Sequence, residues 1–431
     1  MIVQLQPKSQ MMQKLLCPQQ VKETAVYRNA TWVVEFTRNS NRYVYNVLTK
    51  EFVCIHGADA SDRLELIRRW FLVEEEFDEF EYTTQFKRLF GLLNSCKEGI
   101  SSYTIFTTTS CNARCYYCFE RNRPANVMSI PTCSQIVKFI NRNHKGQTVF
   151  IRWFGGEPLM NHGAINSICA GLRSKGIAYQ SSIITNGYLF SDTLLEQAVV
   201  YWKVTKVQIT LDGTESNYNA IKNYIHPDVN PFLTVLNNIG KLVDCGIKVI
   251  IRLNMSLKNV DDLCQLVDLI HKRFDENDLL RITVCALFNL RNEDNERILK
   301  KGLTRIQDIL FKYNLGVSYE CFSKNRVNHC QFDDDGHSIV VFPDGNIGWC
   351  EHALGGLYVG SVAMFNRSEE SLPKCHYEYV VFDKCRRCAL YPDCIKLSNC
   401  DTNNTCYEFE AHYVIRQIKD TMRKVIIRHE A

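Results

Sequence analysis

Three cysteines near residue 115 have a spacing that is suited to metal chemistry. Cys111, Cys115 and Cys118 form the pattern C-x3-C-x2-C. A structural zinc site is closed by four ligands, and an iron–sulfur cluster that only carries electrons also takes four cysteines. Three thiolates therefore indicate a 4Fe–4S cluster in which one iron stays open to a different ligand.

The run Gly155-Gly156-Glu157-Pro158 places a carboxylate beside two glycines. Glycine has no side chain and lets the backbone approach a ligand closely, and Glu157 can accept a charge-assisted hydrogen bond from an amine. On its own the run also fits a plain turn before a helix. The cysteine loop one strand earlier favours the ligand-binding interpretation.

These motifs follow predicted strands. Short segments rich in Val, Ile, Thr and aromatic residues predict strands at 101–108, 148–154, 181–185, 205–211, 247–253 and 280–287. Helical patterns lie between them, as in 161–175 and 259–274. The alternation predicts an α/β fold with a parallel sheet, either doubly wound or a partial barrel. In both architectures the carboxyl ends of the strands carry the site, so we expect the motifs to meet at one rim.

With these motifs the chain resembles the radical S-adenosylmethionine (SAM) superfamily. The resemblance implies a partial (β/α)6 TIM-like barrel over 100–313, in which SAM binds the open iron through its amino and carboxylate groups. It also implies a SAM-derived 5′-deoxyadenosyl radical that abstracts a hydrogen atom from the substrate. The SAM-binding residues implied by the resemblance are Tyr117, Gly155, Gly156, Glu157, Pro158, Asn186, Thr210 and Lys222.

Thr210 and Lys222 occupy the positions that hold the SAM carboxylate in the sulfatase-maturase-like branch of the superfamily. Arg252 and Asn254, at the end of the fifth predicted strand, are candidates for further contacts. A solvated strand end is the alternative for these two residues.

A second group of cysteines fills the carboxyl-terminal part, 314–431. The pattern resembles the SPASM extension of peptide-modifying radical SAM enzymes, which implies two auxiliary 4Fe–4S clusters, with zinc as the alternative metal. The implied ligands of the outer cluster are Cys385, Cys388, Cys394 and Cys406. Those of the inner cluster are Cys330, Cys350 and Cys400, with Cys321 as the fourth and Cys375 or an open iron as alternatives.

Glu351 follows Cys350 directly. The resemblance implies that Glu351 is a catalytic base beside the inner cluster. A hydrogen bond with His352 that only orients the metal ligand is the alternative.

Residues 1–99 precede the predicted barrel. The segment 42–53 predicts a hairpin, and 61–74 and 83–94 predict helices. We expect either a winged-helix-like domain that recognises a precursor peptide or an extension that packs on the barrel. In the first case the hairpin would offer a sheet edge to an extended leader peptide.

Composition excludes several other classes of protein. The 431 residues carry a net charge of +4, which is too small to indicate a nucleic-acid partner. No run of about 18 apolar residues predicts a membrane span, and the first residues lack the apolar core of a signal peptide. Twenty cysteines without an export signal indicate metal ligation in a reducing cytoplasm rather than disulfides.

The resemblance implies a radical SAM peptide maturase with three 4Fe–4S clusters. It would form a thioether or carbon–carbon cross-link in a ribosomally made precursor peptide, with electrons from a flavodoxin or ferredoxin. The alternatives are a sulfatase-maturase-like enzyme that makes formylglycine, a peptide epimerase and, in another class, a non-catalytic metal-binding adaptor.

Overall fold

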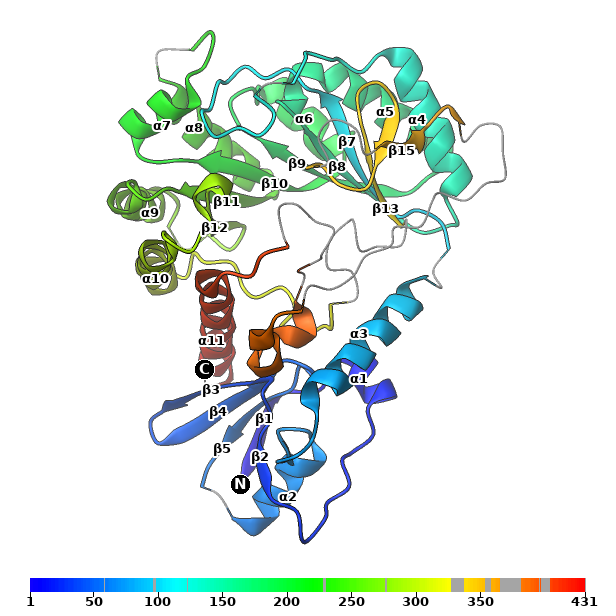
Figure 1. Cartoon of the computed structure of the whole chain (residues 1–431). Helices are drawn as coiled ribbons and strands as arrows, with labels where there is room; N and C mark the ends of the chain where they lie inside the picture. Colours follow the sequence, from blue (N-terminus) through cyan, green and yellow to red (C-terminus); the bar gives the residue numbers. More distant parts are fainter. Residues whose placement is uncertain are drawn as a thin grey trace. The chain divides into compact units, whose positions relative to one another are not determined.

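The computed structural model describes residues 1–57, 59–95, 98–121, 123–227, 230–275, 277–326, 337–352, 358–364, 381–394, 396 and 404–430. The chain divides into two compact units (Figure 1). The first unit comprises Met1–Cys96, Val317–Cys330 and Tyr377–Ala431, and the second comprises Lys97–Gly316 and Gln331–His376. Residues of the predicted domain 314–431 are thus distributed over both units, and the three domain boundaries stay a prediction.

The second unit is built on a nine-stranded sheet with the order β12-β11-β10-β9-β8-β7-β13-β14-β15. The six predicted strands are all present: β7 (Ser102–Thr108), β8 (Val149–Gly155), β9 (Tyr179–Thr185), β10 (Val204–Leu211), β11 (Lys248–Met255) and β12 (Leu280–Ala286). Neighbours among them pair in parallel and follow one another in chain order. A doubly wound sheet reverses its strand order at one point. The unbroken order therefore favours the partial-barrel interpretation.

Three short strands extend this sheet beyond β7. Strand β13 (Ser338–Val341) pairs in parallel with β7, and β14 (Asn346–Gly348) and β15 (Tyr358–Ser361) continue antiparallel. The helices of this unit are α4 (Ile130–Asn143), α5 (His162–Ser174), α6 (Asp192–Val200), α7 (Glu215–Lys222), α8 (Pro231–Asp244), α9 (Val260–Phe274) and α10 (Glu296–Lys312). Their apolar stripes face the strands, as Leu263, Val267 and Ile270 of α9 show by being fully buried.

The first unit contains a four-stranded antiparallel sheet with the order β1-β5-β4-β3. Its strands are β1 (Ile2–Gln6), β3 (Val33–Arg38), β4 (Asn41–Asn46) and β5 (Phe52–Ile55), and a small pair is formed by β2 (Tyr27–Asn29) and β6 (Leu72–Glu74). Its helices are α1 (Gln10–Leu15), α2 (Ala60–Arg68), α3 (Glu79–Ser95) and α11 (Glu408–Glu430). The predicted hairpin is confirmed as β4 and β5. The winged-helix-like assignment stays a prediction.

Two expectations for the first unit were wrong. The predicted helix over 61–74 ends at Arg68, and its last residues form β6 instead. The hairpin offers no free sheet edge, because β4 pairs with β3 and β5 pairs with β1 on their outer sides. The edges of this sheet are β1 and β3.

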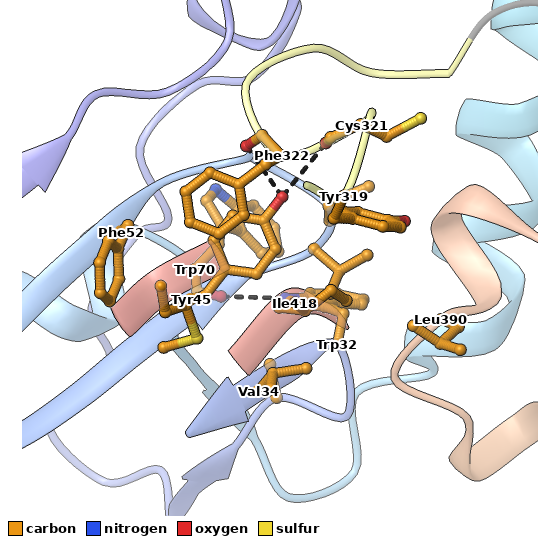
Figure 2. Close-up of a cluster of buried hydrophobic side chains, with 14 of the residues drawn as sticks. Trp32, Val34, Tyr45, Phe52, Trp70, Tyr319, Cys321, Phe322, Leu390 and Ile418 are labelled. Atoms are coloured by element: carbon orange, nitrogen blue, oxygen red, sulfur yellow. Dashed lines mark hydrogen bonds between the residues drawn. The ribbon is translucent and has the colours of Figure 1, made fainter. Parts of the chain in front are cut away.

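Carboxyl-terminal residues complete the core of the first unit. Figure 2 shows Tyr45 of β4 stacked on Phe322, with ring centroids 4.4 Å apart. The Tyr45 hydroxyl donates to the Phe322 carbonyl at 3.0 Å. Ile418 of α11 is fully buried in the same cluster. None of the helices in the described parts of the chain has the length and apolar character that crossing a membrane requires.

Candidate functional site

The three-cysteine loop begins where β7 ends. Burial, the Glu157 charge and the charges of Cys115 and Cys118 raise the pKa of the Cys111 thiol to about 12. The three thiols and the Glu157 carboxylate therefore lie within electrostatic range of one another. Within the described ranges, no three Cys, His, Asp or Glu side chains converge as they do on a single metal ion. Cluster thiolates bind separate irons, so such convergence is not needed here.

Neighbouring loops hold the cysteine loop in place. The Arg114 amide donates to the Lys222 carbonyl at 2.8 Å, and the Ile225 amide donates to the Asn112 carbonyl at 2.9 Å. The Asn186 side-chain amide donates to the Asn112 side-chain oxygen at 2.7 Å. The loops that follow β7, β9 and α7 are thus brought together at one rim of the barrel.

The two glycines after β8 are required by the neighbouring backbone. Gly155 has a φ of +129°, and a Cβ atom there would lie 2.1 Å from the Thr108 carbonyl oxygen. A Cβ on Gly156 would lie 2.4 Å from the Ser110 carbonyl oxygen. The Gly156 amide donates to the Thr108 carbonyl, and the Glu157 amide to that of Ser110. The glycines thus let this run pair with the segment that leads into Cys111, a constraint that the sequence interpretation did not include.

Glu157 is a fully buried carboxylate with several donors around it. Its Oε1 accepts from the Leu159 amide at 3.1 Å and the Thr185 hydroxyl at 2.8 Å, and its Oε2 accepts from the Asn186 amide at 2.8 Å. Burial raises the pKa of Glu157 to about 6, although these hydrogen bonds oppose the shift. Each carboxylate oxygen can accept about two hydrogen bonds. Counting the described donors, Oε2 can still accept one from a ligand amine.

Pro158 occupies the first position of a short 3-10 helix, η1 (Pro158–Asn161), where a missing amide proton costs nothing.

Lys222 and Asp212 form a buried ion pair beneath the cysteine loop. Their side chains are 2% and 1% exposed, and Nζ lies 2.9 Å from Asp212 Oδ2. Tyr117 donates from its hydroxyl to the same Oδ2 at 2.7 Å. Burial alone lowers the pKa of Lys222, but the charges of Asp212 and Tyr117 raise it well above its usual value. The pair therefore connects α7 and the loop after β10 to the residue that precedes Cys118.

Thr210 and Lys222, the two residues predicted to hold the SAM carboxylate, lie together in this cluster. Lys222 Nζ donates to the Thr210 hydroxyl at 2.8 Å and, at 3.4 Å, to the Tyr117 hydroxyl. An ammonium group has three donors, and Asp212, Thr210 and Tyr117 use all three. A ligand carboxylate would have to replace one of these contacts, and the longest is the contact with Tyr117.

Sequence reasoning missed Asp212 as a site residue, although an Asp-Gly pair after a strand was a signal. Asn254 donates to Asp212 Oδ1 at 3.0 Å, and Arg252 donates to the Asn254 side-chain oxygen at 3.0 Å. Asn254 is 6% exposed. Arg252 therefore orients Asn254, which in turn donates to Asp212. Because Asn254 is buried, the alternative of a solvated strand end does not hold at this residue.

Glu351 and His352 lie near the cysteine loop as well. The His352 ring packs on Phe119 at 4.7 Å and on Phe288 at 5.5 Å between centroids. The His352 amide donates to Cys350 Sγ at 3.3 Å. Burial lowers the pKa of His352, although the Glu351 charge opposes this shift. Because Phe119 follows Cys118 directly, the loop of Cys350 packs on the loop of the first three cysteines.

The four cysteines predicted for the outer cluster lie close together in the first unit. Burial raises the pKa of Cys388 to about 11, with further contributions from the charges of Cys394, Cys406 and Cys385. Successive turns shape their loop, with 3-10 helices η5 (Asp383–Arg387) and η6 (Tyr391–Asp393).

The cysteines predicted for the inner cluster are only partly described. Cys330, Cys375 and Cys400 lie outside the described residues. Cys321 is buried in the first unit and accepts from Arg326 Nε at 3.1 Å, whereas Cys350 belongs to the second unit. The ligand set of this cluster stays a prediction.

Fold and site together define an α/β protein with a mostly parallel central sheet and a three-cysteine loop at the carboxyl ends of its strands. Residues 105–270 match the family model of the radical SAM superfamily. This part of the chain is therefore a radical SAM domain.

Two further proteins match the chain in sequence. An uncharacterized protein of Methanocaldococcus jannaschii is 28% identical over 122 residues, and a probable GTP 3′,8-cyclase of Methanococcus maripaludis is 22% identical over 181 residues. These matches cover 28% and 40% of this chain, and only 41% and 59% of the two relatives.

Among solved structures, anSMEcpe with bound AdoMet is similar, with a TM-score of 0.55 and 15% identity over 76% of this chain and 98% of that protein. The same protein has been solved with AdoMet and the Kp18Cys peptide, at 14% identity and a TM-score of 0.55, over 75% of this chain and 98% of that one. At these identities the similarity establishes the shared fold.

Proposed function

We propose that this chain is a peptide-modifying enzyme that uses SAM and a 4Fe–4S cluster held by Cys111, Cys115 and Cys118. When bound, the cluster and SAM supply a 5′-deoxyadenosyl radical that removes a hydrogen atom from the substrate. The observation that carries the proposal is the buried Lys222–Asp212 pair. Lys222 is a cation that could bind an anionic ligand, and Asp212 connects it to the hydroxyl of Tyr117 in the cysteine loop.

The donor set fits such a ligand. Glu157 Oε2 is the acceptor for the amino group of SAM, and Lys222 with Thr210 holds its carboxylate. Both groups are buried in the described structure. Low local dielectric strengthens these charge-assisted bonds, so the site orients SAM and excludes water from it.

The substrate in this proposal is a ribosomally made precursor peptide. The similar protein anSMEcpe has been solved with a peptide as well as AdoMet. The first unit offers the sheet edges β1 and β3, and an unpaired edge binds an extended leader through backbone hydrogen bonds. Glu351 would remove a proton from the substrate near the cysteine loop.

Two auxiliary clusters complete the proposal. The outer cluster would be held by Cys385, Cys388, Cys394 and Cys406, and the inner one by Cys330, Cys350, Cys400 and one further ligand. Forming a thioether or carbon–carbon cross-link leaves extra electrons, and such clusters can accept them. A flavodoxin or ferredoxin would supply the electron that starts the reaction.

Anaerobic iron counting and SAM cleavage test the enzyme and its clusters. We expect about twelve irons per chain and production of 5′-deoxyadenosine under reductant. Cys115→Ala should lose about four irons and all cleavage. Fewer than about eight irons in the wild type would contradict the three-cluster proposal, and a wild type that never cleaves SAM would contradict the proposed chemistry.

Co-expression with a short peptide encoded next to the gene, followed by mass spectrometry, tests the reaction. A cross-link removes a pair of hydrogen atoms, whereas epimerisation leaves the mass unchanged. Formylglycine made from serine also removes two hydrogens, but it reacts with a hydrazide and a cross-link does not. A hydrazide-reactive product would replace the cross-link proposal with the sulfatase-maturase-like alternative.

A further inference from the structure

One face of helix α3 lies against the loop that carries the carboxyl-terminal cysteines. Phe80, Thr84 and Lys87 are spaced by four and three residues, so they share a helix face. The Phe80 ring stacks on Tyr391 at 4.7 Å between centroids. The Thr84 hydroxyl lies 2.9 Å from the Tyr391 hydroxyl, and Lys87 Nζ donates to the Tyr391 carbonyl at 3.3 Å. All three residues thus contact Tyr391, which lies between Cys388 and Cys394.

Lys87 reaches the cysteine ligand loop itself. Its side chain is among the large side chains that are fully buried, and Nζ donates to the Cys394 carbonyl at 2.9 Å. Burying an ammonium group is costly unless its donors are bonded. Two of the hydrogen bonds of this ammonium group are accepted by carbonyls of the cysteine loop. The position of that loop therefore depends on the position of Lys87.

A second buried lysine holds the same loop from the sheet. Lys50 lies in the turn between β4 and β5, with a φ of +68°, a backbone conformation that side-chain-bearing residues seldom adopt. Its side chain is 0% exposed and pairs with Asp393, the residue before Cys394. The Tyr319 hydroxyl also donates to Asp393 Oδ2, at 2.7 Å. The Asp393 side chain is only 3% exposed. Breaking its contact with Lys50 would therefore leave a buried carboxylate without its cation.

We propose that Lys50 and Lys87 are positioning residues for the cysteine loop 385–394. In this proposal the amino-terminal segment is part of the scaffold of a metal site, in addition to any role in peptide recognition. The proposal depends on the auxiliary cluster proposed above for Cys385, Cys388, Cys394 and Cys406. Residues that orient metal ligands typically change metal affinity about 10–100-fold when they are replaced.

This arrangement changes how a truncation must be interpreted. Removing residues 1–99 also removes Lys50, Lys87 and the α3 face. A truncated protein that fails to modify its peptide could therefore have lost its outer cluster rather than its leader-binding surface. Single substitutions in the full chain separate the two causes.

The test is Lys87→Met in the full-length protein, reconstituted anaerobically with iron and sulfide. Methionine fills similar space without the donors. We expect loss of about four irons per chain and loss of one set of electron paramagnetic resonance signals from the reduced protein. The signals of the Cys111, Cys115 and Cys118 cluster should remain.

The matched control is Arg28→Met. Arg28 pairs with Glu79, whose side chain is 4% exposed, in the same unit. Its other bonds are to the carbonyls of Asn29, Glu75 and Phe77. Removing it leaves the buried Glu79 carboxylate with the Thr31 amide as a donor but without a cation. None of the lost contacts is with the cysteine loop, so this variant should keep its full iron content and spectrum.

The outcomes separate the two proposals. A wild type with only about four irons overturns both the auxiliary clusters and the positioning role. A wild type with about twelve irons and a Lys87→Met variant with the same iron content and spectrum overturns the positioning role alone. If Lys87→Met does not fold, Thr84→Val and Lys50→Met are measured instead. Unchanged iron and spectra in both would likewise overturn the proposal.

Discussion

Replacing Lys222 by methionine tests the ion pair beneath the cysteine loop. Asp212 would be left 1% exposed, with hydrogen bonds from Tyr117 and Asn254 but no cation. Removing one partner of a buried pair costs about 3–5 kcal/mol. Because two donors to the carboxylate remain, we expect the lower end, about 3 kcal/mol. For a unit of this size that loss lowers the melting temperature by about 6–12 °C.

The assay is thermal unfolding of anaerobic protein, paired with equilibrium dialysis of SAM. The double variant Lys222→Met, Asp212→Asn no longer buries an unpaired charge, so it should regain about 2 kcal/mol of the lost stability. Its SAM affinity should stay at least about tenfold below the wild type, equivalent to about 1.4 kcal/mol. The reason is that the proposed carboxylate contact is still missing.

These two measurements answer separate questions. A double variant that is no more stable than Lys222→Met would refute the inference that Lys222 compensates the Asp212 charge. A double variant that binds SAM as tightly as the wild type would refute the clamp while leaving the ion pair intact. Thr210→Val serves as a milder companion, since it removes only the 2.8 Å bond from Lys222.

Two further predictions concern the run after β8. Gly156→Ala should destabilise the protein by about 1–3 kcal/mol and lower its iron content, because the new Cβ would meet the Ser110 carbonyl at 2.4 Å. Gly163→Ala, with no atom within 4 Å of its Cβ position, should change neither quantity, and equal effects of both substitutions would contradict the packing argument. With a pKa of about 6, Glu157 loses its charge as the pH falls, so SAM should bind about tenfold more weakly at pH 5 than at pH 7. A flat profile in equilibrium dialysis would count against Glu157 as the acceptor of the SAM amine.

The strands of the barrel could be predicted because each is a short β-branched or aromatic run between turn signals. Their succession, together with the motifs, also placed the site at one rim. Local patterns failed where tertiary contacts decide the backbone. The predicted helix over 61–74 stops early because Trp70 takes a φ of +65°. In that conformation its indole donates to the Cys17 carbonyl at 2.9 Å, a contact with no local sequence signal.

Long-range charge pairing was the other feature that the sequence could not reveal. Lys50 and Asp393 are 343 positions apart, and neither has a neighbour that marks it as buried. The Asp-Gly pair at Asp212 was visible after a predicted strand, but its partners from α7, β11 and the cysteine loop had no local sequence signal. Spacing identifies ligands that are close in sequence, whereas the groups that hold those ligands come from distant elements.

The buried lysines also affect the chemistry of the two cysteine loops in the same way. Burial raises the pKa of Cys118, and the Lys222 charge opposes that shift. Burial likewise raises the pKa of Cys385, and the Lys87 charge is among the groups that oppose it. Cysteine binds metal as the thiolate, so each cysteine of the proposed clusters would have to lose its proton. A buried cation beside each loop lowers the cost of that step, so replacing either lysine should weaken metal binding even where the loop keeps its shape.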